Sequence, residues 1–345
     1  MLTLSVSRRS YRCATRTLTR VSLLAVAATS LLASNSYATG PASASPTSKI
    51  TLEFVPGVTT DPFYITLYNG ALAEAKKLGI TLHWAGATTW GPEYQTPVLE
   101  TVLAAHPDGL IVTPTDDRGS YSAIHAFINK HIPVVTVDTT LLNTAGLLSR
   151  ITSDDYAGGE TAARLLAARA DGNGTIAYYE TTAGNTPGLQ RQGGFVAEIK
   201  AHYPRIHLVA FPNNTTTDSE TSAEETAQEG ILANPDLRGI YAPQDYLAAG
   251  AGAAVKAEGK SGKITVIGYD AEPEDVKLLR EGAIQALVAQ RPALEGQLAV
   301  EYEYDYLTGR GAEVPKSYKT PNVLMTKANI KDPSISQYIY ASKPM

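Results

Sequence analysis

The chain has 345 residues, which is enough for two globular domains. Its composition, with 43% hydrophobic and 18% charged residues, excludes a disordered or fibrous protein. Residues 1–38 hold five arginines and no acidic residue, which leaves 24 basic and 34 acidic residues and a net charge of −10 on the rest. Such an acidic body argues against nucleic acid as a partner. The single cysteine, Cys13, excludes an intramolecular disulfide and a Cys-ligated metal site.

The chain opens with a basic and then an apolar segment. Five arginines precede the apolar run 21–33, and Ser36-Tyr37-Ala38 has small residues at the two positions that a signal peptidase recognises. The run is too short to cross about 30 Å of hydrocarbon. We predict a signal peptide over 1–38, cleaved near Ala38, then a flexible mature N-terminus over 39–48 and export to the periplasm. Both Sec and twin-arginine export stay open, because residues 7–11 resemble a twin-arginine signal only faintly.

From residue 49 onward, short runs rich in β-branched residues alternate with longer segments at helical spacing. A first set has strands over 50–55, 80–85, 109–113 and 132–137, with helices over 62–78, 93–105 and 121–130 between them. The run 132–137 is almost entirely apolar, which is typical of a strand buried on both faces of a parallel sheet.

The pattern restarts after residue 155. It predicts helices over 156–170, 189–202, 220–233 and 246–258, and strands over 175–179, 207–211, 239–242 and 264–268. A last unit has a helix over 274–281, a strand over 283–289 and a helix over 292–308, and the pattern alone does not decide the lobe to which it belongs. The sequence therefore predicts an α/β fold of two similar lobes, each a parallel sheet sandwiched by helices.

Polar and aromatic side chains follow the predicted strands, where ligands bind in open parallel sheets. The candidates are Asp61, Phe63, Tyr64, Trp90, Asp138, Arg191, Gln244, Asp270 and Gln290. For Asp61, as for Asp245, a helix N-cap is the alternative role. As a set, carboxylates accept hydrogen bonds from hydroxyl pairs, Arg donates in a planar fork, and aromatic rings cover C–H faces. This is the chemistry that a sugar requires.

Enzymatic and metal motifs are not found in the sequence. It holds no GxSxG elbow and no nucleophile with a paired base, and its six histidines form no HxxxH or HxH pair. We therefore predict a protein without catalytic residues, metal or cofactor.

Six pieces of the chain, in order, closely resemble the bacterial periplasmic ribose-binding protein and its relatives, the solute-binding proteins of sugar ABC importers. The resemblance runs from about residue 49 to 330. Its pieces are Asp61-Pro62-Phe63-Tyr64, the run 132–138 ending in Asp138, Arg191-Gln192-Gly193-Gly194-Phe195, Ala242-Pro243-Gln244-Asp245, the run 266–270 ending in Asp270, and Val288-Ala289-Gln290.

The resemblance implies a type I periplasmic binding fold with a three-segment hinge near Thr152, Arg291 and Asn322. The N-terminal lobe would comprise 49–151 plus 292–322, and the C-terminal lobe 152–291 plus 323–345. Phe63 and Tyr64 would stack on the sugar. Polar contacts would come from Asp61, Asp138, Arg191, Gln244, Asp270 and Gln290.

The chain also departs from the family pattern. Asn is usual at the positions of Asp61 and Gln244, an Arg often stands where this chain has Thr139, and the second stacking aromatic expected near Thr217 is missing. We expect Trp90 to take the place of that aromatic. These departures leave the sugar and its anomer undetermined.

The resulting functional prediction is a monomeric periplasmic protein that captures a monosaccharide and delivers it to an ABC permease in the inner membrane by hinge closure. A ligand-presenting sensor for a chemoreceptor or sensor kinase is the alternative, as is a binding protein for a polyol or furanone signal. A sugar-responsive DNA-binding regulator would need a helix-turn-helix segment and no export leader. A secreted hydrolase or isomerase would need a catalytic pair.

Overall fold

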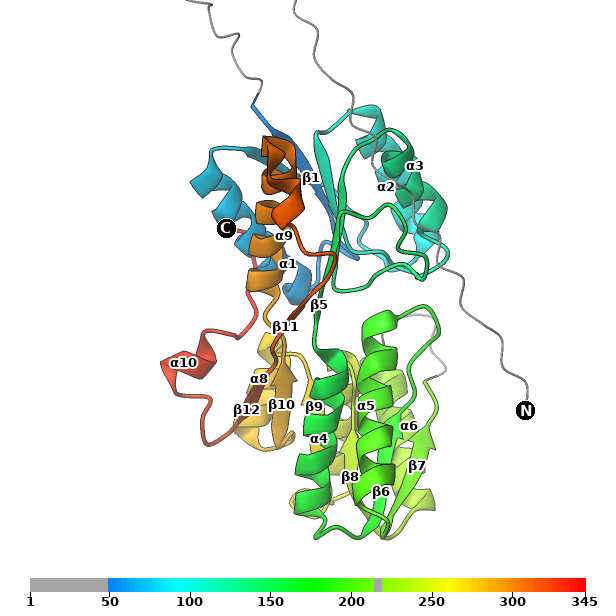
Figure 1. The fold of residues 1–345 in the computed structure, drawn as a ribbon. Coiled ribbons are helices and arrows are strands. Elements are labelled where there is room, and N and C mark those ends of the chain that lie inside the picture. The colour runs from blue at the N-terminus through cyan, green and yellow to red at the C-terminus, as the bar shows by residue number, and fades with distance from the viewer. Residues whose placement is uncertain (1–48, 214–218) are drawn as a thin grey trace, which may run out of the picture. The chain divides into compact units, whose positions relative to one another are not determined.

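The fold was obtained as a computed structural model, which describes residues 49–213 and 219–345 (Figure 1). The predicted signal peptide, the mature N-terminus and Thr217 lie outside these residues. Two six-stranded sheets form the framework of the described part. No helix within it is both long enough and apolar enough to cross a membrane.

The first sheet is entirely parallel, in the order β11-β5-β4-β3-β1-β2. Its strands are β1 (Thr51–Val55), β2 (Thr81–Trp84), β3 (Gly109–Val112), β4 (Val134–Val137), β5 (Ser149–Ser153) and β11 (Tyr318–Thr320). The helices packed on it are α1 (Pro62–Leu78), α2 (Pro92–Ala104), α3 (Tyr121–Asn129) and α9 (Pro292–Asp305). Successive residues of each strand face opposite layers: Phe54 packs in the cluster that contains α1 and α9, and Val55 in the one that contains α2 and α3.

The second sheet has the order β12-β10-β9-β8-β6-β7, with only the edge strand β12 antiparallel to its neighbour. Its strands are β6 (Gly174–Tyr179), β7 (Ile206–Phe211), β8 (Leu237–Tyr241), β9 (Thr265–Tyr269), β10 (Ala286–Ala289) and β12 (Val323–Thr326). Its helices are α4 (Asp155–Arg169), α5 (Thr186–His202), α6 (Glu220–Ala233), α7 (Asp245–Ala257) and α8 (Pro273–Glu281). In Figure 1, α4 and α5 lie side by side over this sheet.

The chain passes between the sheets at three places: from β5 to α4, from β10 to α9, and from β11 to β12. Hydrogen bonds join these crossings. Both Ser153 and Thr320 donate hydroxyl hydrogen bonds to Oε1 of Glu295, at 2.7 and 2.8 Å. The three side chains are buried, and burial raises the pKa of Glu295 to about 8. We call this group the crossover cluster.

The chain ends with a short helix, α10 (Pro333–Ser336), and a segment that forms hydrogen bonds with residues of both lobes. The Tyr340 hydroxyl donates to Asp270, at the end of β9, while the Ala341 N–H donates to the Thr66 hydroxyl and the Met345 N–H to Asn69, both on α1. Residues Ala341 and Met345, which the family resemblance places in the second lobe, are therefore bonded to a helix of the first sheet.

Most predicted elements match the structure to within a few residues. The strands β5, β11 and β12 and the helix α10 were not predicted. The predicted helix 292–308 is α-helical only to Asp305, and a π-helical turn, Tyr306–Arg310, follows it. Gly309 has a φ of 87°, a left-handed conformation that ends the helix.

Candidate ligand-binding site

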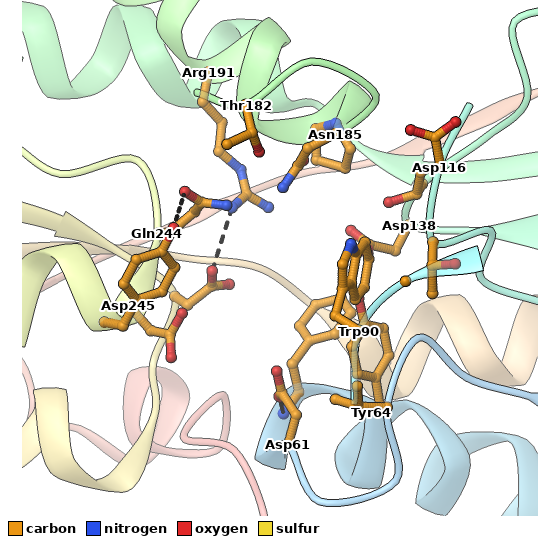
Figure 2. A pocket seen from close by; sticks show the side chains of 18 of the residues that line it. Asp61, Tyr64, Trp90, Asp116, Asp138, Thr182, Asn185, Arg191, Gln244 and Asp245 are labelled. Atoms are coloured by element: carbon orange, nitrogen blue, oxygen red, sulfur yellow. Dashed lines mark hydrogen bonds and ion pairs between the residues drawn. The ribbon is translucent and has the colours of Figure 1, made fainter. Parts of the chain in front are cut away.

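All nine candidate residues line one cavity of about 390 Å³. The residues come from the loops that follow strands of both sheets and from the N-terminal turns of the helices α1 and α5 after such loops. The strand order reverses between β1 and β3 in one sheet and between β6 and β8 in the other, which is where parallel α/β sheets open a crevice. Figure 2 shows Arg191, Gln244 and Asp245 on one side of the open space and Tyr64, Trp90 and Asp138 facing them.

The aromatic part of the cavity comes from the first sheet's side. Phe63 and Tyr64 lie in the first turn of α1, with ring centroids 5.1 Å apart and nearly perpendicular planes. Trp90 follows β2 and stacks on Tyr64, with centroids 6.3 Å apart and an interplanar angle of 26°. A Cβ at Gly57 would lie 2.3 Å from the Trp90 ring, so a glycine is needed there for the indole to occupy this position.

Asp61 combines the two roles that the sequence left open. Its Oδ1 accepts a hydrogen bond from the Phe63 N–H at 2.7 Å, which caps the N-terminus of α1, and its side chain also lines the cavity. Asp245, by contrast, is not a cap. It is the first residue of α7, and the capping position belongs to Gln244, whose side chain makes no capping hydrogen bond.

Asp138 directly follows β4 in a left-handed conformation, with a φ of 62°. Its N–H continues the ladder to Ile151, and the turn then directs its side chain to the cavity. Its Oδ2 accepts a hydrogen bond from the Tyr64 hydroxyl at 2.9 Å. Burial raises the pKa of Asp138 to about 7, an effect that the Arg191 guanidinium partly opposes.

Arg191 is held by two carboxylates in a buried position on α5. Its Nε donates to Asp155 at 2.8 Å and its Nη1 to Asp270 at 3.3 Å and to the Pro243 carbonyl at 3.0 Å. The guanidinium carbon lies 3.9 Å from the centroid of the Tyr269 ring. These contacts fix the orientation of the Arg191 guanidinium at the cavity, and the two carboxylates balance its charge before any ligand binds.

Asp270 ends β9 in the same left-handed way as Asp138, with a φ of 73°. Its Oδ1 accepts from Gln290 Nε2 at 2.6 Å and from the Tyr340 hydroxyl at 2.9 Å. The Gln290 amide is thus fixed by its nitrogen, while its Oε1 is buried without a hydrogen-bond partner in the described structure. A ligand donor would satisfy this oxygen.

The cavity also has lining residues that the sequence analysis did not select. They include Glu93, Thr115, Asp116, Thr182, Asn185, Tyr246 and Glu272. The sequence analysis also missed Asp155, which accepts a hydrogen bond from Arg191 Nε. Its position in the first turn of α4, just after a strand of the first sheet, could have marked it as a candidate. Within residues 49–213 and 219–345 no group of three or more His, Cys, Asp or Glu side chains has the arrangement of a metal site.

The arrangement suits recognition of a small polyhydroxylated molecule. One side offers stacked aromatic faces and the other a planar donor fork and carboxylate acceptors. The site can bind and orient a ligand in place.

Trp90 gives a direct optical test of this geometry. The other tryptophan, Trp84, packs on Tyr68 and Phe54 and does not line the cavity. Ligand binding should change indole fluorescence in wild type and in Trp84→Phe, and the change should vanish in Trp90→Phe. Affinity in Trp90→Phe should fall only modestly, since phenylalanine keeps a stacking face. Survival of the signal in Trp90→Phe would place Trp90 outside the ligand contact.

Comparison with known proteins defines the class. Residues 52–311 match the family model of the periplasmic binding protein domain, and the chain belongs to this family. It is similar to the ribose import binding protein of Haemophilus influenzae, with 29% identity over 79% of this chain and 90% of that protein.

Solved structures agree. A solute-binding protein of Agrobacterium vitis in complex with α-D-tagatopyranose has a TM-score of 0.80 and 32% identity over 85% of this chain and all of that chain. One from Actinobacillus succinogenes with bound D-allose has a TM-score of 0.75 and 28% identity over 82% of this chain and all of that chain. The predicted fold is confirmed: it is a type I periplasmic binding protein of the ribose-binding kind. The relatives are binding proteins of transporters and not enzymes, as the sequence predicted.

Proposed function

We propose that this chain captures a monosaccharide in the cavity between its two sheets and delivers it to an ABC permease from the periplasm. The observation that supports this most is the convergence of all nine candidate residues, from both sheets, on one cavity with aromatic, donor and acceptor groups. The relatives support it as well: the Haemophilus influenzae protein is named for ribose import, and the two solved structures of other binding proteins hold tagatose and allose. The periplasmic location rests on the same relatives and on the predicted leader.

Hinge closure is the proposed mechanism, with 49–151 plus 292–322 as one lobe and 152–291 plus 323–345 as the other. Tyr64, Trp90 and Asp138 come from the first sheet's side, and Arg191, Asp270 and Gln290 from the second's. A ligand touches both sets together only when the cleft is closed, so it favours the closed state by that difference in affinity. The permease would then recognise the closed form.

A thermal-shift screen of about fifty monosaccharides and polyols tests the proposal. A ligand present at 100 times its dissociation constant stabilises the native state by about 2.7 kcal/mol, which gives a clear rise in melting temperature. We expect one or a few monosaccharides to produce such a rise. A flat response to every monosaccharide would contradict the proposal, whether or not another class of molecule gives a rise.

Asp138→Asn should weaken the binding of the ligand found in this screen by about tenfold or more. Asparagine keeps the volume and tolerates the left-handed backbone, but its amide offers one acceptor oxygen in place of two, and a ligand hydroxyl left unpaired costs about 1 to 3 kcal/mol. Isothermal titration calorimetry measures the change. Asp171→Asn is the matched control, since Asp171 has a φ of 53° in an exposed turn away from the cavity. Equal affinity in Asp138→Asn and Asp171→Asn would remove Asp138 from the site.

A further inference from the structure

The cavity is lined by many more acidic than basic side chains. Among its described lining residues the only basic side chain is Arg191, whereas seven are acidic: Asp61, Glu93, Asp116, Asp138, Asp245, Asp270 and Glu272. Arg191 is already matched by its ion pairs with Asp155 and Asp270. The lining therefore carries a large excess of carboxyl groups over basic groups.

Three of the carboxyl groups belong to the ends of helices that meet at the cavity. Asp61 precedes α1, Asp245 begins α7 and Glu272 precedes α8. Figure 2 shows Asp61 and Asp245 bordering the same open space from different elements. Burial raises the pKa of Glu272 to about 11, and the nearby carboxylates of Asp61, Asp245 and Asp270 act in the same direction. We call Asp61, Asp245 and Glu272 the carboxyl triad.

An independent feature of the cavity also calls for a hydrogen-bond donor. Gln290 lines the cavity and is only 2% exposed, and its Oε1 has no partner in the described structure. Its Nε2 is fixed on Asp270 at 2.6 Å, so the amide cannot turn over without losing that bond. A buried acceptor left unpaired is costly, and a donor from the ligand would satisfy this one.

We propose that the ligand carries a protonated amino group, so that it is an amino sugar or amino-polyol of monosaccharide size whose ammonium lies among the carboxyl triad. This rests on the proposed function, in which the cavity binds a monosaccharide-sized polyol. An ammonium has three donors and no acceptor, which suits a cavity rich in acceptors. Its positive charge favours the ionised form of Glu272, whose pKa is raised by burial and by the neighbouring carboxylates, and hydrogen bonds from an ammonium to carboxylates are charge-assisted and stronger than those of a neutral hydroxyl. The remaining hydroxyl groups would bond to Asp138, Arg191 and Gln290 as a neutral sugar's would.

An organic ammonium fits this place better than an inorganic cation. The described residues include no cluster with the arrangement of a metal site, the triad included. The stacked rings of Tyr64 and Trp90, which line the same cavity, suit the C–H face of a sugar ring.

Matched pairs of ligands test the proposal by isothermal titration calorimetry at pH 7. The pairs are 2-amino-2-deoxy-D-glucose with D-glucose, 2-amino-2-deoxy-D-galactose with D-galactose, and 1-amino-1-deoxy-D-fructose with D-fructose. In at least one pair the amino compound should bind about tenfold tighter or more than its hydroxyl parent.

Variants of the triad show whether its carboxyl groups cause this preference. The preference should fall below about threefold in the double variant Asp61→Asn with Glu272→Gln. The asparagine of that variant still has a side-chain oxygen that can cap α1, as the Asp61 Oδ1 does. Glu281→Gln, at the exposed end of α8, is the control and should keep the preference.

The outcomes separate the two proposals. If neutral sugars bind as tightly as their amino counterparts, or more tightly, in all three pairs, the inference fails and the proposed function stands. If neither these compounds nor any monosaccharide of the thermal-shift screen binds, the proposed function fails with it. Calcium chloride alone is the inorganic arm: stabilisation by Ca²⁺ equal to that by the amino compound would also overturn the inference.

Discussion

Arg191→Met should lower the free energy of unfolding by about 3 to 5 kcal/mol, because it leaves the buried carboxylates of Asp155 and Asp270 without their counter-charge. It should also weaken ligand binding by about a hundredfold or more, since the cavity loses its only described cation and Asp270 loses one of the groups that hold it. Urea unfolding followed by circular dichroism measures the first effect, and calorimetry the second.

Three further variants test whether the loss of stability comes from the buried ion pairs of Arg191. Arg164→Met removes an exposed arginine on α4, with carboxylates at 3.5 and 3.6 Å, and should cost less than about 1 kcal/mol. Arg191→Lys keeps the charge without the planar fork and should lie between wild type and Arg191→Met. Adding Asp155→Asn to Arg191→Met removes one unpaired anion and should restore part of the stability. A loss below about 1 kcal/mol in Arg191→Met would show that the ion-pair group does not stabilise the fold.

Glu295→Gln should change how the stability of the protein depends on pH. The folded protein raises the pKa of Glu295 from its ordinary value of 4.5 to about 8, so between these values the folded state binds a proton that the unfolded state has released. Stability from this group is therefore complete below about pH 4.5 and declines as pH rises through about 8. A shift of this size corresponds to on the order of 5 kcal/mol.

Glutamine cannot ionise, and it keeps an oxygen that accepts from Ser153 and Thr320. The difference in unfolding free energy between Glu295→Gln and wild type should therefore move in favour of the variant as the pH is raised from about 5 to about 9. Urea unfolding across this range measures it. Glu301→Gln, on the same helix but outside the crossover cluster, is the control. Parallel pH profiles for wild type and Glu295→Gln would contradict the prediction.

The sequence predicted the strands in the middle of each sheet well but missed β5, β11 and β12, which lie next to the crossings between the sheets, and the reason is physical. Strands such as β3 and β4 are buried on both faces and stand out from their surroundings. The strand β5 has the sequence Ser-Arg-Ile-Thr-Ser, and two of its buried side chains are serines whose hydroxyls bond to the Pro315 carbonyl and to Glu295. These partners are 166 and 142 residues away in the chain, and no local pattern contains them.

The candidate site shows the same division. Side chains placed directly after strands were predicted because the carboxyl edge of a parallel sheet follows from strand order. Asp155 and Glu272 were missed because each lies at a helix start, where an acidic residue has an ordinary explanation in the helix dipole. Only the structure shows that Asp155 faces Arg191 and that Glu272 lies among other carboxyl groups.

The backbone at Asp138 and Asp270 limits how this protein could change its ligand. Both residues have a positive φ, a conformation that aspartate, asparagine and glycine adopt far more readily than β-branched or bulky residues. In a laboratory selection for binding of a new ligand, we therefore expect only a few residue types to be recovered at these two positions, whichever ligand is used. No such restriction applies to three other lining residues, which do not have a positive φ: Trp90, Thr139 and Gln244. Substitutions that change ligand specificity should therefore arise first at these positions, while the backbone of the two turns retains Asp138 and Asp270.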